Sequence, residues 1–175
     1  MKKAALFISC IIMLWFSGVP SLAWQGKVVD VRDGDFIKVA HPEKGVLGIM
    51  LYGIDAPDKG QPFFKQAKEF LQDKVEGQVV TVQEFVTEQK VFTAVILHEG
   101  VNINEQTLQE GYGWVYKKYC DQDFCAAWQT YEKQAREQKL GLWQDENSIP
   151  PWEWRKKVLT KIFRIILWVL PPWSD

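Results

Sequence analysis

The sequence predicts an α+β domain built mainly from short strands. Between the third and fourth expected strands, apolar residues recur at helical spacing from Phe63 to Val75, between Pro62 and Gly77. Five strands with a helix inserted after the third are typical of a small antiparallel barrel of the OB type. The expected strands are rich in β-branched residues and lie within residues 26–34, 35–42, 45–54, 78–86 and 91–100.

Turn and cap signals set the limits of these elements. The Asp33-Gly34 pair lies between the first two strands and predicts a hairpin. After the fifth strand, a short helix is expected over about residues 104–110 and a longer one over about 124–139, each followed by a glycine. The domain is therefore expected to carry about three helices.

Residues 1–23 have the layout of a secretory signal. Two lysines precede an apolar run over residues 4–16, and a small-residue pattern ends at Ala23. Cleavage after Ala23 would leave a mature chain that starts at Trp24. An uncleaved anchor is the alternative, but the apolar run is shorter than the roughly 20 residues that span a bilayer. We expect a periplasmic or secreted protein.

Cys120 and Cys125 form a closely spaced pair in the segment YCDQDFC. In an oxidising compartment, such a pair predicts a local disulfide ahead of the last helix of the domain. Metal binding is the alternative reading. Neither His41 nor His98 lies near the pair in the sequence, so a disulfide is favoured.

Charge divides the mature chain into two segments. The expected domain, residues 24–152, holds 14 Lys and Arg against 20 Asp and Glu, whereas residues 153–175 hold five basic and two acidic residues. Neutralisation of phosphate by Lys and Arg dominates nucleic-acid affinity. An acidic domain is poorly suited to binding DNA or RNA unless the fold gathers a local basic patch.

The tail, residues 153–175, combines basic and apolar residues. Apolar side chains fill most positions from 158 to 170, and Lys161 and Arg164 interrupt them. The apolar part is too short to span a bilayer comfortably, but it suits a helix at a membrane surface or against a partner. We expect residues 156–173 to dock on a membrane surface or a membrane-protein partner, with packing on the chain's own barrel as the alternative.

Several blocks occur in an order that resembles the staphylococcal nuclease (thermonuclease) family in its secreted bacterial form. The resemblance spans about Gly26 to Lys156 and rests on VRDGDFIKV, LYGIDAPDKGQP, FFKQAKEFL, GYGWVYKKYC, and EKQAREQKLGLW followed by PPWEWRK. It implies an OB-fold barrel that cleaves phosphodiester bonds in DNA and RNA with calcium. In such a site carboxylate oxygens hold Ca²⁺, a glutamate activates water and two arginines bind the phosphate.

The resemblance assigns roles to three carboxylates. The metal carboxylates of the family fall on Asp35, in DGDF, and on Asp55, in GIDAP. The family's catalytic glutamate falls on Asp58, whose side chain is one methylene shorter. The acidic part of the site is therefore expected to remain, with a shortened general base.

The arginines of the family pattern are absent. The first arginine position is Met50 and the second is Val91. Lys90 precedes Val91, but adjacent residues of a strand point to opposite faces. Phe36 follows the first metal aspartate, where the family usually has threonine. Ala56 follows the second, where the family usually has threonine or cysteine. Calcium binding is therefore possible but expected to be weak or lost.

The segment WVYKKY is the expected nucleic-acid contact. In the family, aromatic side chains surround the nucleotide here, and stacking contributes about 1 to 3 kcal/mol per base. The resemblance thus makes Trp114, Tyr116, Lys117 and Lys118 candidates for nucleic-acid binding. Alternatively, Trp114 and Tyr116 pack the mouth of the barrel.

Two functions follow from these observations. Losing one transition-state donor costs on the order of 10²-fold to 10³-fold in rate, so losing two would leave little catalysis. We expect a non-catalytic, exported binding or accessory module of a membrane-associated assembly. The alternative is an active calcium-dependent endonuclease in which Lys90, Lys117 or Lys118 contacts phosphate.

Overall fold

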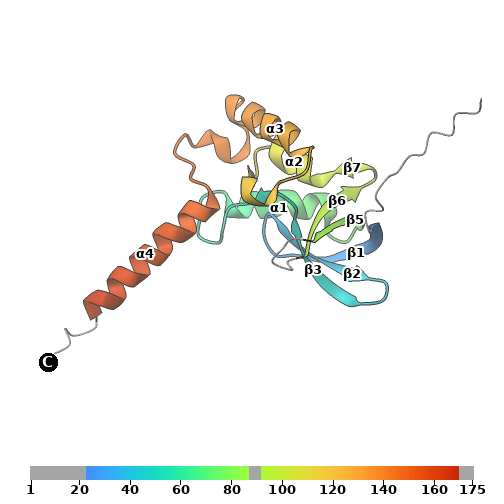
Figure 1. Ribbon diagram of the computed structural model, residues 1–175, viewed down its shortest axis with the longest axis horizontal. Coiled ribbons are helices and arrows are strands. Elements are labelled where there is room, and N and C mark those ends of the chain that lie inside the picture. Colours follow the sequence, from blue (N-terminus) through green and yellow to red (C-terminus); the bar gives the residue numbers. More distant parts are fainter. Residues whose placement is uncertain (1–22, 87–91, 170–175) are drawn as a thin grey trace, which may run out of the picture.

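The computed structural model describes residues 23–86 and 92–169. Residues 1–22 of the expected signal segment, together with Lys90 and Val91, lie outside the described residues. The described chain forms a barrel flanked by three helices, with a fourth helix at its C-terminal end (Figure 1).

Five strands close the barrel. Strand β1 pairs antiparallel with β2 and β5, β2 pairs with β3, and β5 pairs with β6. A parallel pairing of β3 with β6, through Met50 and Leu51, completes the ring. The barrel strands are β1 (Ala23–Val31), β2 (Phe36–His41), β3 (Gly45–Leu51), β5 (Val79–Val86) and β6 (Phe92–His98).

The OB-type barrel predicted from the sequence is confirmed, with one difference in pairing. The prediction was an antiparallel barrel, whereas the closing β3–β6 pair is parallel. A parallel pair requires a long crossover, and the chain between β3 and β6 supplies one through α1 (Phe64–Val75) and β5. Every second side chain of a strand points into the barrel, as Ile37 and Val39 of β2 do, and these side chains fill the interior.

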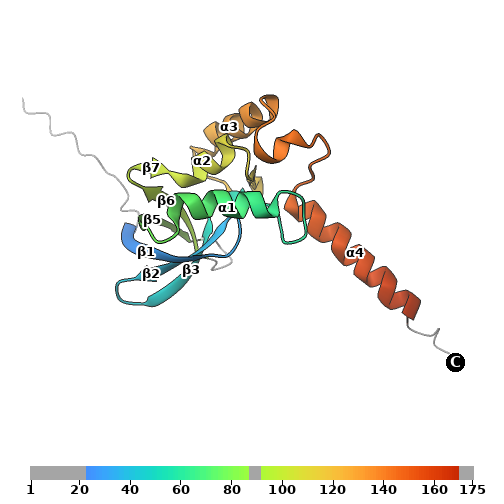
Figure 2. The ribbon, with the colours of Figure 1, turned by 180° about the vertical axis from the view of Figure 1, so that it is seen from behind.

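The three helices of the domain cover the barrel and its upper end (Figures 1 and 2). Helix α1 buries Ala67, Leu71 and Val75, which confirms the helical period predicted from Phe63 to Val75. Helix α2 (Ile103–Gln109) and helix α3 (Cys125–Glu137) correspond to the two further helices expected. Trp128 of α3 is fully buried and extends the core from the barrel into the helical layer.

Short elements join the helical layer to the barrel edge. Strand β4 (Ile54–Asp55) pairs with β8 (Trp114–Val115), so that Asp55 lies opposite Trp114. Strand β7 (Val101–Asn102) extends the sheet beside β6. The 3₁₀ helices are Lys117–Tyr119 and Gly141–Gln144.

The predicted disulfide between Cys120 and Cys125 is confirmed. It ties the segment after β8 to the first residue of α3. The Cys120 sulfur lies where a side chain on Gly53 would clash, at 2.7 Å from the ideal Cβ position. Gly53 also has a left-handed φ of 67°, so the turn between β3 and β4 requires glycine for two independent reasons.

Helix α4 (Pro151–Val169) begins at the barrel edge and points away from the domain (Figures 1 and 2). Its first turns contact the domain, whereas Val158 and Leu159 are exposed. None of the helices in the described ranges has both the length and the apolar character needed to cross a membrane.

Candidate active site

A turn and a short strand bring Asp35 and Asp55 to one edge of the barrel, with Asp55 as the last residue of β4. Asp35 lies in the turn between β1 and β2, and its backbone carbonyl accepts a hydrogen bond from the Leu51 N–H at 2.7 Å. Its Oδ2 accepts a second from the Ala56 N–H at 2.9 Å, so the residue after Asp55 is joined directly to Asp35. The two carboxylates that the family resemblance assigns to the metal are therefore held close together, one in the β1–β2 turn and one at the end of β4.

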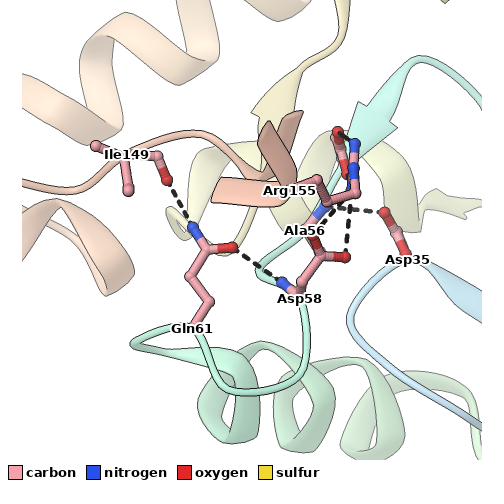
Figure 3. A network of polar contacts seen from close by, with 7 residues as sticks. Asp35, Ala56, Asp58, Gln61, Ile149 and Arg155 are labelled. Atoms are coloured by element: carbon pink, nitrogen blue, oxygen red, sulfur yellow. Dashed lines mark hydrogen bonds and ion pairs between the residues drawn. The ribbon is translucent and has the colours of Figure 1, made fainter. Parts of the chain in front are cut away.

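Asp58 joins this acidic cluster through a cation that the sequence analysis did not identify. The Arg155 guanidinium, from α4, bridges Asp55 and Asp58. Its contact with Asp58 is drawn in Figure 3. Its Nη2 donates to Asp55 Oδ2 at 2.7 Å, and its Nη1 lies 3.2 Å from Asp55 Oδ1 and 3.0 Å from Asp58 Oδ2. A further contact of 3.2 Å joins Nη1 to Asp58 Oδ1. We call Asp35, Asp55, Asp58 and Arg155 the acidic site.

Burial controls the electrostatics of the acidic site. Burial raises the pKa of Asp35 well above its usual value, the nearby Asp33 charge raises it further, and the Ala56 N–H opposes the shift. Burial also raises the pKa of Asp55, because desolvation outweighs the opposing effect of Arg155. The hydrogen bond to Asp55 raises the pKa of Arg155, which stays fully charged. Asp35 has no ion-pair partner within the described residues, whereas Asp55 and Asp58 both pair with Arg155. Of the buried pair Asp35 and Asp55, Asp35 is therefore the one whose ionised form is less compensated.

Asp35→Asn is therefore expected to stabilise the domain near neutral pH, because it removes the cost of ionising a buried carboxyl. The folded-state pKa of Asp35 lies above the unfolded one, so ionisation lowers stability as pH rises through the interval between them. Below the unfolded pKa of about 3.9, both states carry a proton and the gain should vanish. Urea unfolding of parent and variant in EDTA, as a function of pH, measures this. A variant less stable than the parent at neutral pH would show that the carboxylate is compensated.

The candidate aromatic residues both contact other rings of the protein. Trp114 is buried and packs edge-on against Trp143, with ring centroids 5.2 Å apart. Tyr116 is half-buried and stacks on Trp152 of α4, at a centroid distance of 5.1 Å and an interplanar angle of 14°. Trp152 thus covers one face of the ring that the resemblance assigns to nucleotide stacking.

Lys117 and Lys118 follow Tyr116 in the 3₁₀ helix, and both are exposed. The Lys118 ammonium lies 5.3 Å from the centroid of the Tyr119 ring. The two lysines therefore stand beside the Tyr116–Trp152 stack and add positive charge to an otherwise acidic domain. Lys90, the other candidate phosphate contact, lies outside the described residues.

Met50 occupies the first arginine position of the family pattern. It pairs across the sheet with Phe36, the residue after Asp35, and with Thr93 of β6. It is 36% exposed, so the position opens to solvent beside the acidic site. A thioether there cannot donate a hydrogen bond to phosphate. The Arg32 guanidinium lies 5.5 Å from the Phe36 ring centroid, on the same part of the surface.

The acidic site as it stands does not fit calcium. Within the part of the chain that the structure describes, no group of three or more His, Cys, Asp and Glu side chains is arranged to hold a metal ion. Both oxygens of Asp55 and both of Asp58 contact Arg155 instead. The guanidinium therefore supplies the positive charge that a metal would otherwise bring.

Gln61 fixes the loop that carries Asp58, and the sequence analysis did not identify it. Its Oε1 accepts from the Asp58 N–H at 3.1 Å, and its Nε2 donates to the Ile149 carbonyl at 2.6 Å (Figure 3). Because Ile149 lies two residues before the first residue of α4, one buried amide connects the Asp58 loop to the segment that leads into that helix. Its position between Gly60 and Pro62 signals a turn but gives no sign of this distant partner.

Asn104 of α2 is a second buried polar residue that supports the site. Its Nδ2 donates to the carbonyls of Tyr52 and Ala94, both at 3.1 Å, and its Oδ1 accepts from the Ile96 N–H at 3.0 Å. It thereby joins α2 to β6 and to the turn that precedes Asp55. No local sequence signal distinguishes this asparagine from the neighbouring Asn102.

These features define a class of protein: an OB-type barrel with a partly buried acidic cluster at the edge where β4 meets β8. Comparison with protein families gives the more particular identification. Residues 48–145 match the family model described as staphylococcal nuclease homologue. The chain belongs to this family, as its resemblance predicted.

Curated relatives agree with the family assignment. An uncharacterized endonuclease of Escherichia coli is 36% identical over 135 residues, covering 76% of this chain and 86% of the relative. A micrococcal nuclease of Shigella flexneri is 34% identical over 164 residues, covering 87% and 93%. A probable staphylococcal-like nuclease of rice, Oryza sativa subsp. japonica, is 38% identical over 109 residues, covering 62% and 21%.

Proposed function

We propose that this staphylococcal nuclease homologue has lost phosphodiester hydrolysis and works as an exported binding module of a membrane-associated assembly. The observation that carries the proposal is the bridge from Arg155 to Asp55 and Asp58. The bridge supports the proposal because the resemblance assigns Asp55 to the metal and Asp58 to the general base, and a side chain of the protein itself binds both.

The surroundings of the bridge support loss of catalysis. Phosphoryl chemistry needs cationic groups at the oxygens where charge develops, and each such donor is worth on the order of 10²-fold to 10³-fold in rate. Met50 brings no charge to the first of the two expected positions. Arg155 has its guanidinium directed to carboxylates, and Asp58 is both shorter than the family's glutamate and paired.

An active calcium-dependent endonuclease remains the second candidate, on one observation. The relatives from Escherichia coli and Shigella flexneri are named endonuclease and micrococcal nuclease, and they match most of the chain. In that case Arg155, Lys117 or Lys118 would have to turn toward phosphate, and Arg155 would have to leave the carboxylates.

A cleavage assay separates the two functions. Purified residues 24–175 are incubated with supercoiled plasmid and single-stranded DNA in millimolar calcium, beside Asp35→Ala and an EDTA control. The proposal expects no cleavage above the Asp35→Ala background. Calcium-dependent cleavage that disappears in Asp35→Ala would establish the endonuclease instead.

The direction and composition of α4 support attachment to a membrane surface. The helix leaves the domain, its apolar Val158 and Leu159 are exposed, and Lys156 and Lys157 precede them. Apolar side chains next to basic ones suit the headgroup region of an anionic membrane. The export signal expected from the sequence supports a periplasmic or secreted location for the domain.

Deleting residues 158–175 is expected to abolish binding to anionic lipid vesicles while leaving the domain folded. Sedimentation with vesicles of phosphatidylglycerol and phosphatidylcholine compares residues 24–175 with residues 24–157. Lys156→Glu/Lys157→Glu in the longer chain should weaken binding, because each basic residue near an anionic surface contributes about 1 kcal/mol. Equal sedimentation of the two chains would exclude the helix as the membrane contact.

A further inference from the structure

We propose that Arg155 is an internal latch: its guanidinium competes with a divalent cation for Asp55 and Asp58, and while bound it holds the start of α4 on the barrel. This inference does not depend on whether the chain hydrolyses DNA. It concerns which cation occupies the acidic site and what that occupancy does to α4.

The contacts of Arg155 leave little room for a second cation. Its two terminal nitrogens lie 2.7 to 3.2 Å from all four carboxylate oxygens of Asp55 and Asp58. A calcium ion would bind such oxygens at about 2.3 to 2.6 Å. Two positive charges on the same oxygens would repel one another strongly in this partly buried place. Occupancy by the guanidinium and by a divalent cation is therefore mutually exclusive.

The latch is able to open, because the ion pair between Arg155 and Asp58 is in contact with water. The side chain of Arg155 is 45% exposed and that of Asp58 is 34% exposed, whereas that of Asp55 is only 8% exposed. Ion pairs near the surface contribute little net stability and exchange readily. Leaving the buried Asp55 carboxylate without any cation would be costly. Arg155 is therefore expected to leave when another cation replaces it.

Release of Arg155 would loosen the start of α4. Arg155 belongs to the same short segment as Trp152, which stacks on Tyr116, and Ile149, whose carbonyl accepts from Gln61. Of these three attachments, only the one through Arg155 is ionic. Cation binding and release of α4 are thus two readouts of one equilibrium. By linkage, a partner that pulls α4 away from the barrel would raise cation affinity by the same factor.

Calorimetric titration with calcium tests the competition directly. We expect Arg155→Gln to bind calcium at least about tenfold more tightly than the parent. The apparent affinity is proportional to the fraction of molecules in which the site is open, and removal of the guanidinium raises that fraction. Lys156→Gln is the matched control: it removes one positive charge from the next position of α4, and its affinity should equal that of the parent. All variants are made in residues 24–175 and checked for folding by circular dichroism.

Two further variants locate the effect. Asp55→Asn added to Arg155→Gln should abolish the gain, and Arg155→Lys should retain most of the competition. Equal calcium affinity of the parent and Arg155→Gln would overturn the proposal, as would a gain that survives Asp55→Asn. Neither outcome depends on DNA cleavage, so the latch and the proposed function fail independently.

A distance measurement tests the coupling to α4. Nitroxide labels at Val79→Cys and Leu159→Cys, both exposed in the parent, report the distance between the barrel and the helix by electron paramagnetic resonance. Saturating calcium should broaden this distance distribution toward the one seen in Arg155→Gln without calcium. A distribution that calcium leaves unchanged, in a chain shown to bind it, would contradict the link between the cation and the helix.

Discussion

Met50→Arg combined with Val91→Arg is expected to give the chain calcium-dependent DNA cleavage once Arg155→Gln has opened the acidic site. The gain over Arg155→Gln alone should be at least about 10²-fold, the effect of one well-placed transition-state donor. Residue 50 faces solvent and pairs with Phe36, directly beside Asp35. An arginine at this position can therefore reach a phosphate held at the acidic site. Initial rates on end-labelled single-stranded DNA measure the gain.

A misplaced arginine is the control for this result. Val46→Arg replaces Met50→Arg in the same background, because Val46 is an exposed residue on the same face of β3 but four positions away. It adds the same charge without reaching the site and should give no gain. Asp35→Ala should remove the activity gained through Met50→Arg. Equal rates with Val46→Arg would show that general positive charge, and not the clamp, had been missing.

Asn104→Leu is expected to destabilise the domain by about 3 kcal/mol. The substitution keeps a side chain of similar size but leaves the Ile96 N–H and the Tyr52 carbonyl without their Asn104 hydrogen bonds. Each buried group left unsatisfied costs about 1 to 3 kcal/mol. Urea unfolding, followed by tryptophan fluorescence, gives the change in the free energy of unfolding.

Asn102→Ala provides the comparison for Asn104. Asn102 caps α2 by accepting from the Glu105 N–H at 3.2 Å, and loss of such a cap costs about 1 kcal/mol. The two residues are the same amino acid at opposite faces of one turn, so their difference isolates the buried network. If Asn104→Leu cost no more than Asn102→Ala, the three hydrogen bonds of Asn104 would not be the link between α2 and the barrel.

Local patterns accounted for the barrel and its helices. Alternating β-branched residues located the strands, and the spacing of Ala67, Leu71 and Val75 located α1, since each element buries one face. The short separation of Cys120 and Cys125 was sufficient to predict the disulfide. The parallel closure of β3 on β6 was missed, because strand order depends on contacts between residues far apart in the chain.

The occupant of the acidic site could not be predicted from local pattern. Asp35 and Asp55 were identified through the family resemblance, but Arg155 lies 100 positions beyond Asp55. Its basic neighbours, Lys156 and Lys157, made it look like part of a docking helix. The stack of Trp152 on Tyr116 was missed for the same reason. A residue on one element that completes a site in a distant part of the chain leaves no periodic pattern in the sequence around it.

Whether the parent chain hydrolyses DNA is measured by single-turnover cleavage with the parent and Arg155→Gln, each in calcium and in EDTA. We expect no calcium-dependent product from either chain, because Arg155 occupies the carboxylates in the parent, and Arg155→Gln frees them without supplying a phosphate clamp. Product from the parent that disappears in Asp35→Ala would show instead that Arg155 belongs to a working nuclease.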